Sequence, residues 1–338
     1  MAKEEVVPIL GIETSCDETA VAIVKNGREI VESLVSSQIK LHQPFGGVVP
    51  EIASRAHLDN LPLLMDKLLE STQINLEDIV AIGVTQTPGL VGALLVGISY
   101  AKGLAVALNK PLIGINHLYG HIYAAKMEHP SLEYPYLCLV VSGGHTGLYL
   151  AHSPLEYQLI GQTIDDAAGE AFDKVASLLN LGYPGGPIID KISKEGNPRA
   201  YEFPRSFLNE KDRFDFSFSG LKTAVLYKTR GQDKRRQAPL LEDIVIPDVA
   251  ASFQSAVVDV LVGKTMEGAK KWNIPRIALG GGVACNSYLR EEMVQAGKKE
   301  GIEVFLPSLP YCTDNAAMIA GLAYHYWKAG QTSQLDLE

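Results

Sequence analysis

The fold is decided by residues 8–36, which read PILGIETSCDETAVAIVKNGREIVESLVS. The apolar run 8–13 leads into the polar turn 14–18, and the second apolar run 19–24 leads into Asn26-Gly27. Asn-Gly between apolar runs is typical of a tight hairpin turn, because both residues tolerate a positive φ. The stretch therefore predicts a strand, a polar turn, a second strand, and a hairpin into a third strand over 28–36.

Strands and helices alternate after this meander. Residues 51–71 carry an apolar stripe at helical spacing. Further along the same half we expect a strand at 79–85, a helix at 90–108, a strand at 112–115 and a helix opening near His117. This alternation is typical of an α/β layered fold.

A second half restarts near Tyr136. Residues 137–142 predict a strand, Gly143-Gly144-His145 a tight turn, and 146–151 a returning strand. Because this repeats the design of residues 9–24, we interpret the chain as a duplication with two related lobes facing each other across a cleft. Downstream the sequence predicts helices near 166–180, 247–272 and 284–299, strands near 276–279 and 302–305, a last helix over 313–328, and a loop-rich insertion over 197–239.

Composition narrows the class of protein. The chain has 338 residues, 46% of them hydrophobic, and a formal net charge of −9. This charge argues against nonspecific coating of nucleic acid but leaves a local or shared RNA surface open. The four cysteines form no CxxC pair, which indicates reduced thiols and a cytoplasmic location. The apolar stretch 90–108 contains Lys102 and several glycines, so we expect a core helix and no membrane span.

A pair of histidines is the sharpest chemical feature. His117 and His121 lie four residues apart, so on a helix both imidazoles reach one side and can share an ion. Asp314, just where the last helix is expected to begin, is the carboxylate that we expect to complete the site. The alternative is an ordinary surface or interface pair. A zinc protease is disfavoured because Leu118 stands where that mechanism needs a glutamate.

Glycine-rich turns follow two of the predicted strands. The stretches 140–146 and 278–286 can each turn backbone N–H groups toward an anion or let a nucleotide approach the backbone. Neither matches the P-loop or the G-x-G-x-x-G pattern, so nucleotide binding of another type is the favoured interpretation. Asp173 is placed to meet a sugar hydroxyl, and Asp190 follows the rigid turn 184–187.

Acidic and basic groups offer further candidates. Glu13, Asp17 and Glu18 of the first turn can orient a metal-bound water or take a proton, or can simply cap and solvate the turn. Positive charge interleaved with aromatic residues suits an RNA contact, although a solvated loop is an equal alternative. The residues concerned are Lys222, Lys228, Arg230, Lys234, Arg235 and Arg236, with Phe214, Phe216 and Phe218.

Taken together, these motifs resemble a known family over nearly the whole chain. They are GIETSCDET (11–19), GGVVPE (46–51), PGLVGAL (88–94), HLYGH (117–121), VSGGHT (141–146), DDAAGEAFDK (165–174), DFSFSGLKT (215–223), GGGVACN (280–286) and CTDN (312–315). The chain resembles the bacterial TsaD family, which makes N6-threonylcarbamoyladenosine in tRNA. The archaeal and eukaryotic branch has a metal-binding Tyr where Val140 and Val141 stand here, which fits the bacterial branch.

The resemblance implies a fold, a site and a reaction. The fold is the actin-like, sugar-kinase-like ATPase fold (ASKHA), with duplicated ribonuclease-H-like cores. The reaction moves the threonylcarbamoyl group of threonylcarbamoyl-AMP to N6 of adenosine 37 in tRNAs reading ANN codons, and AMP leaves. His117, His121 and Asp314 would bind Fe²⁺ or Zn²⁺, and any ATP would bring Mg²⁺. The nucleotide contacts would be Val140, Val141, Ser142, Gly143, Gly144, Asp173, Gly186, Asp190 and Asn286, with Glu13 and Asp17 as catalytic candidates.

The resemblance also implies partners. A TsaB-like pseudo-enzyme would pair through the first lobe, a TsaE-like ATPase would join the assembly, and a homodimer could form without them. We expect the first lobe over 1–134 and 316–338, and the second over 135–315 with its insertion at about 197–240. An ATP-dependent small-molecule kinase of this fold and a non-catalytic nucleotide-binding subunit are the alternatives; a kinase has no reason to hold a metal on two imidazoles.

Overall fold

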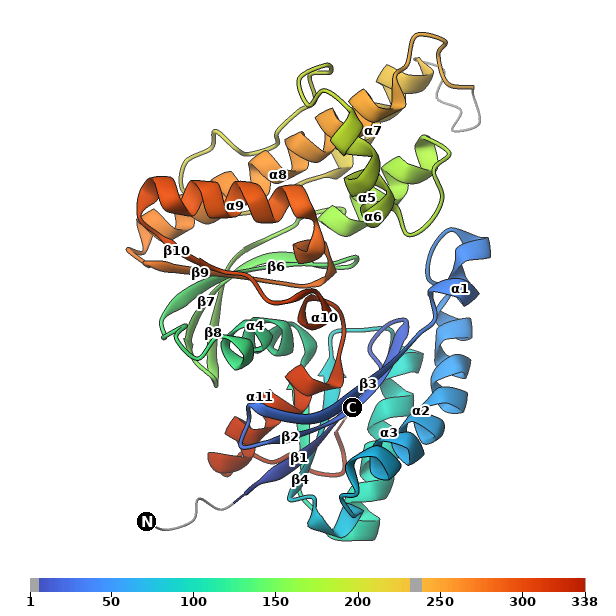
Figure 1. The fold of residues 1–338 in the computed structure, drawn as a ribbon, viewed down its shortest axis with the longest axis vertical. Coiled ribbons are helices and arrows are strands. Elements are labelled where there is room, and N and C mark those ends of the chain that lie inside the picture. Colours follow the sequence, from blue (N-terminus) through green and yellow to red (C-terminus); the bar gives the residue numbers. More distant parts are fainter. Residues whose placement is uncertain (1–5, 232–238, 338) are drawn as a thin grey trace. The chain divides into compact units, whose positions relative to one another are not determined.

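The computed structural model describes residues 6–231 and 239–337, which divide into two compact units (Figure 1). The first comprises Met1–Ser131, Pro154–Glu156 and Pro307–Glu338, and the second comprises Leu132–Ser153 and Tyr157–Leu306. The chain returns to the first unit at Pro307, earlier than the expected boundary at residue 316. Asp314 therefore belongs to the same unit as the two histidines.

The sheet of the first unit has the order β3-β2-β1-β4-β5. Strands β1 (Pro8–Glu13), β2 (Glu18–Lys25) and β3 (Glu29–Ser37) form an antiparallel meander. Strand β4 (Ala81–Thr87) pairs with β1 in parallel, and β5 (Leu112–Asn116) pairs with β4 in parallel. Asn26 and Gly27 have φ values of 53° and 74°, so the predicted hairpin turn is confirmed.

Helices cover both faces of this sheet (Figure 1). On one face lie α2 (Pro50–Thr72) and α3 (Val91–Leu108), and on the other lie α4 (His117–Glu128) and α11 (Ala316–Lys328). Ile9 of β1 packs with α4 and α11, whereas its neighbour Leu10 packs with α2 and α3. Because successive side chains of a strand point to opposite faces of the sheet, β1 contributes to two hydrophobic cores. Shorter elements are α1 (Ile39–His42), η1 (Gln43–Phe45), η2 (Leu76–Asp78) and α10 (Leu309–Cys312).

The second unit repeats the strand order of the first. Its sheet is β10-β9-β6-β7-β8, so reading from β8 gives the same sequence of neighbours as reading from β3. Strand β6 (Tyr136–Val141) pairs with β7 (Thr146–Ser153) in antiparallel and with β9 (Arg276–Gly280) in parallel. The remaining strands are β8 (Glu156–Gln162) and β10 (Glu303–Phe305). The expected duplication of an α/β core is confirmed.

The helices of the second unit carry its glycine-rich and acidic motifs. They are α5 (Ala168–Leu178), α6 (Gly185–Ile192), α7 (Ser219–Arg230), α8 (Ile246–Lys271) and α9 (Ser287–Glu300), with 3-10 turns η3 (Ser193–Glu195) and η4 (Gly282–Cys285). The expectation of long loops over 197–239 was incomplete, because α7 lies inside that stretch. Leu221 and Val225, one helical turn apart, are buried and stabilise it.

Among the described residues, two helices are long and apolar enough to cross a membrane. Of the α8 window 72% is buried, which is typical of a core helix. Of the α3 window only 33% is buried. Helix α3 packs on the sheet through Leu94, Ile98 and Ala101, and it leaves Val91, Leu95 and Val106 exposed. It covers the core with one face only.

Candidate functional site

The histidine pair begins helix α4 at the end of a buried strand. Asn116 is the N-cap residue, and its Oδ1 accepts hydrogen bonds from the backbone N–H groups of Leu118 (2.9 Å) and Tyr119 (3.3 Å). This cap starts the helix at His117 and sets His121 one turn further on. The two rings meet edge to face with centroids 4.7 Å apart. Both imidazoles are buried, with exposed fractions of 5% and 0%.

Asp314 reaches the histidines from the loop that precedes α11. The next residue, Asn315, caps α11 by accepting from the Met318 N–H at 2.9 Å, so the loop is anchored. Asp314 Oδ1 lies 3.1 Å from His121 Nε2 and 3.4 Å from His117 Nε2. One candidate ligand atom from each of these three residues lies within 4.8 Å of the others. The three residues expected as metal ligands therefore lie together.

Glu13 lies behind His117 and is fully buried. Its Oε2 accepts from His117 Nδ1 at 2.9 Å and from Thr85 Oγ1 at 2.5 Å, and its Oε1 accepts from Ser15 N at 2.5 Å. A carboxylate on Nδ1 holds the proton there and leaves the Nε2 lone pair free for a metal ion. This contact spans 104 positions of sequence, and residue spacing gave no sign of it.

Charge at the centre suits a cation. Burial by itself lowers the pKa of His117, but the carboxylates of Glu13 and Asp314 raise it well above its usual value. Against the opposing effect of burial, His117 and His121 lower the pKa of Asp314. The buried carboxylate of Glu13 and the half-buried carboxylate of Asp314 thus favour positive charge at this place. Among the described residues, His121 Nδ1 has no hydrogen-bond partner. Two imidazole nitrogens and one carboxylate oxygen form a donor set that suits Fe²⁺ or Zn²⁺.

The acidic turn between β1 and β2 lies beside this centre. Ser15 Oγ is 3.2 Å from His117 Nδ1. Asp17 is half-buried. Burial, followed by the negative charges of Asp314 and Asp17, raises the pKa of Glu18 to about 9. The protonated form of Glu18 is thus favoured, while the side chain of Asp17 lies partly exposed close by.

The residues expected to contact the nucleotide all lie in the second unit. Val140 and Val141 are buried at the end of β6, so their backbone, and not their side chains, borders the turn 142–144. Gly143 and Gly144 are exposed, and a Cβ built on either would meet no described atom within 4 Å. Backbone at such a place is open to close approach by a ligand.

Hydrogen bonds join the other nucleotide candidates. Asp173 Oδ1 accepts from the Gly185 N–H at 2.7 Å, which ties α5 to the start of α6 next to Gly186. Asp190 Oδ1 accepts from Ser287 Oγ at 2.9 Å, immediately beyond Asn286. Asp190 and Asn286 are thus brought together, and Asp173 is fixed against the turn before them.

Asn286 has a buried partner that sequence reasoning missed. Its Oδ1 caps α9 through the Leu289 N–H at 2.9 Å, and its Nδ2 donates to Gln254 Oε1 at 2.7 Å. Gln254 Nε2 in turn donates to Ser193 Oγ at 2.9 Å. A glutamine inside an apolar helix pattern is the only signal that the sequence offered.

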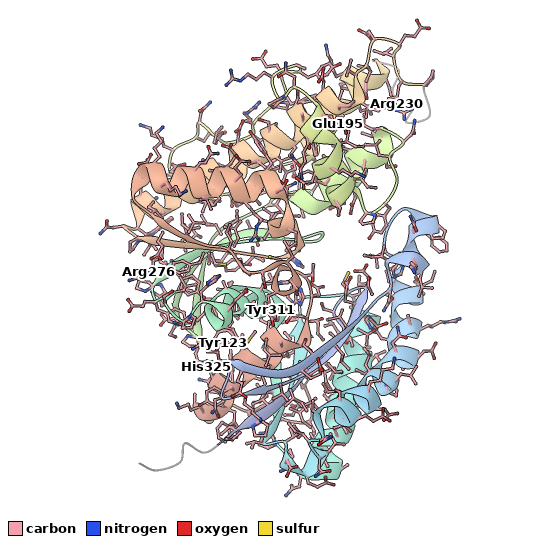
Figure 2. The ribbon with its side chains drawn as sticks, viewed as in Figure 1. Tyr123, Glu195, Arg230, Arg276, Tyr311 and His325 are labelled. Atoms are coloured by element: carbon pink, nitrogen blue, oxygen red, sulfur yellow. The ribbon has the colours of Figure 1, made fainter. Side chains whose placement is uncertain are left out.

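The interpretation of residues 214–236 as an RNA-binding patch is wrong for most of its described members. The exposed fractions of Phe214, Phe216 and Phe218 are 5%, 0% and 1%, so these rings cannot stack on bases. Arg230, labelled in Figure 2, is buried and donates to the Leu178 carbonyl at 2.6 Å and to Asn180 Oδ1 at 3.2 Å.

The remaining basic residues of that stretch differ in their surroundings. Lys222 donates to Asp166 Oδ2 at 3.5 Å, and Lys228 lies over the ring of Tyr201. Lys234, Arg235 and Arg236 lie outside the described residues.

Solved structures with the same architecture define the class of protein. Full-length HypF in its phosphate- and nucleotide-bound form matches with a TM-score of 0.64 at 15% identity, over 98% of this chain and 48% of that one. Component A of the (R)-2-hydroxyglutaryl-CoA dehydratase of Acidaminococcus fermentans matches with a TM-score of 0.56 at 17% identity, over 96% and 99%. The chain is thus an α/β protein of the actin-like ATPase fold.

Sequence comparison then gives the family. The family model described as tRNA N6-adenosine threonylcarbamoyltransferase (TsaD) matches residues 29–321. A relative of that name in Thermosipho africanus is 52% identical over 330 residues, which cover 98% of this chain and 97% of the relative. Another in Thermosipho melanesiensis is 54% identical over 331 residues, which cover 98% of this chain and 97% of the relative. The relative in Clostridium novyi is 52% identical, covering 98% and 96%. The chain belongs to the TsaD family.

Proposed function

We propose that this chain transfers the threonylcarbamoyl group of threonylcarbamoyl-AMP to N6 of adenosine 37 in tRNAs that read ANN codons. The observation that carries the proposal is identity above 50% along 98% of the chain to transferases named for this reaction. The adenine amine forms a bond to the carbamoyl carbon, the bond from that carbon to the phosphate oxygen breaks, and AMP leaves. The amine loses one proton in the exchange.

A divalent metal ion, with Fe²⁺ preferred to Zn²⁺, would be held by His117, His121 and Asp314. The convergence of these three side chains supports the assignment. When bound, the ion supplies a Lewis acid for the acyl phosphate. Glu13 is fully buried and bonded to His117, Thr85 and Ser15, which supports a role in orienting His117. Of the two catalytic candidates, the half-buried Asp17 is the better candidate to accept the amine proton.

The second unit would hold the nucleotide. The open turn at Ser142, Gly143 and Gly144 allows the backbone from Val140 onward to approach a phosphate. The N-terminus of α9 favours negative charge, and Asn286 caps it. Asp173, Gly186 and Asp190 would then contact the ribose or adenine. Where ATP replaces the adenylate, Mg²⁺ would accompany its phosphates.

Partner subunits would complete the enzyme in the cytoplasm. A net charge of −9 favours tRNA that is held jointly with other chains. The outer face of α2 and α3 exposes Leu58, Leu63, Leu95 and Val106, and a groove on it is lined by Leu61, Pro62, Val96 and Tyr100. An apolar face of this kind suits a TsaB-like pseudo-enzyme, with a homodimer as its substitute when that partner is absent. A TsaE-like ATPase would act on the assembled pair.

The test is reconstitution of the reaction from purified components. The chain, its partner proteins, labelled threonine, bicarbonate, ATP and tRNA are combined, and modified adenosine is measured. A variant with His117→Ala and His121→Ala should lose the product, whereas Glu128→Gln, at the other end of α4, should retain it. Full-rate modification by the double variant would show that the proposed metal role is wrong. Phosphorylation of a small acceptor without tRNA would instead support a kinase.

A further inference from the structure

The acidic turn between β1 and β2 is held by three donors: one in helix α2 and two in the loops that precede α1 and α3. The Ser15 carbonyl accepts from the Leu90 N–H at 2.8 Å, and the Asp17 carbonyl accepts from the Gln38 N–H at 2.9 Å. Between them, the Cys16 carbonyl accepts from His57 Nε2 at 2.9 Å. Two of the donors are backbone groups that no substitution except proline removes. His57 is the donor that a side-chain change can remove.

The imidazole of His57 is fixed in one orientation. It lies on α2 with no exposed surface. Because the Cys16 carbonyl can only accept, Nε2 carries the proton and Nδ1 accepts from Thr19 Oγ1 at 2.8 Å. Burial lowers the pKa of His57, so the ring stays neutral and keeps this tautomer. Thr19 begins the buried part of β2, just after the turn.

A second histidine supports the first through a buried amide. Gln38 Nε2 lies 3.4 Å from His57 Nδ1, and Gln38 Oε1 lies 3.2 Å from His42 Nε2. His42 Nδ1 accepts from the Val49 N–H at 3.2 Å, so its Nε2 carries the proton toward Gln38. Gln38 and His42 are buried as fully as His57. Buried polar side chains that are hydrogen-bonded in series fix one arrangement of the backbone around them.

The backbone that they fix carries the chemistry of the first unit. Ser15 lies 3.2 Å from His117 Nδ1, and its N–H is bonded to Glu13. Asp17 and Glu18 follow Cys16 directly. A shift of the Cys16 carbonyl therefore moves Ser15 on one side and the two carboxylates on the other.

We propose that His57 is a positioning residue for threonylcarbamoyl transfer, acting through the Cys16 carbonyl on the turn from Ser15 to Glu18. The inference rests on the proposed function of this chain. Displacement of a catalytic group by about 1 Å can cost about 100-fold in rate. Loss of the His57 donor should accordingly lower kcat and leave the affinity for tRNA unchanged, because His57 itself touches no substrate.

The experiment uses the full chain with its partners in the reconstituted reaction. We expect His57→Ala to lower kcat by about 10–100-fold, with KM for tRNA and metal content within about twofold of wild type. His57→Gln places an amide N–H where Nε2 stood and should restore much of the rate. Thr19→Val removes the hydroxyl donor to His57 Nδ1. The kcat of this variant should lie between the values for His57→Ala and His57→Gln.

The matched control is His325→Ala. His325 is a half-buried histidine of the same unit that contacts Tyr123 and not the turn, so it reports general destabilisation. Wild-type kcat in His57→Ala would overturn the inference. A loss of rate that merely follows the loss of melting temperature across His57→Ala, His57→Gln, Thr19→Val and His325→Ala would also overturn it. If His57→Ala does not fold, the positioning role of His57 is tested instead by the kcat values of His57→Gln and Thr19→Val. An inactive wild-type assembly would instead overturn the proposed function and the inference with it.

Discussion

At the scale of single residues, the buried carboxylate of Glu13 orients His117, the first of the proposed metal ligands. Its Oε2 accepts a hydrogen bond from the Nδ1–H of that ring at 2.9 Å. A carboxylate in this place raises the basicity of the opposite nitrogen and fixes the ring. We expect Glu13→Gln to weaken metal binding by about 10–100-fold, measured by titrating the metal-free protein with Fe²⁺ or Zn²⁺.

The control for this substitution lies at the other end of the same helix. Glu128 is the last residue of α4, seven residues beyond His121, and it accepts from the Ser308 N–H at 2.7 Å. Glu128→Gln should therefore bind the metal as wild type does. Equal affinities for Glu13→Gln and Glu128→Gln would contradict the orienting role of Glu13.

His325 predicts an acid sensitivity of the first unit. Its Nε2 lies 2.7 Å from the Tyr123 hydroxyl, and Figure 2 shows the two residues next to each other. Burial, assisted by Lys328 and Lys126, lowers the pKa of His325 to about 4. A depressed pKa contributes stability that is complete above the unfolded value near 6.5 and is lost as pH falls toward 4.

We expect the unfolding free energy of wild type to drop between pH 7 and pH 4.5 by roughly 1–2 kcal/mol more than that of His325→Gln. Urea titrations at the two pH values measure this difference. Parallel pH profiles for the two proteins would show that His325 does not contribute.

At the scale of elements, the first unit depends on a close approach of β1 to α11. A Cβ at Gly11 would lie 2.3 Å from the Ala316 carbonyl oxygen and 2.8 Å from the Ala320 nitrogen. Backbone atoms cannot move aside as a flexible side chain can, so the helix must shift. Asp314 precedes this helix by two residues and would shift with it.

Gly11→Ala should therefore destabilise the protein by about 1–3 kcal/mol or more and reduce its metal content. The matched change is Gly103→Ala in α3, where the new Cβ meets no described atom within 4 Å. That variant should be unchanged or more stable by about 0.5–1 kcal/mol, because alanine favours the helix. Denaturant unfolding of both measures the contrast, and similar stabilities would refute the packing argument.

At the scale of the whole molecule, the outer face of α2 and α3 predicts how the chain assembles. Leu58 and Leu95 have exposed fractions of 61% and 52%, and both line a mainly apolar groove on this face. We expect the double variant Leu58→Asp, Leu95→Asp to remain folded but to lose its partner on size-exclusion chromatography, because buried unpaired charge is costly.

Leu159→Asp is the control for the assembly. Leu159 is similarly exposed, at 45%, but lies on β8 of the second unit. It should pair as wild type does. Normal pairing by the double variant would place the partner elsewhere on the molecule.

Sequence alone determined most of the elements and the three candidate metal ligands, His117, His121 and Asp314. Period-two and helical patterns depend on local residues, so β1, β2, α2, α3 and α4 were predicted within a few residues. The helical spacing of His117 and His121 follows from the same local rule. The family could be inferred because its motifs are contiguous in the chain.

Tertiary structure decided what each long-range partner does. The sequence made Glu13 a candidate proton acceptor, but in the structure it lies behind His117 and is hydrogen-bonded to that ring. The sequence also suggested that Arg230 and three nearby phenylalanines bind RNA, but in the structure all four side chains are buried. The sequence also showed no sign of strand β8 or helix α7. Nor did it indicate the hydrogen bond from His57 to the Cys16 carbonyl. The physical reason is distance along the chain, because local patterns specify which face of an element is buried but not which remote group it meets there.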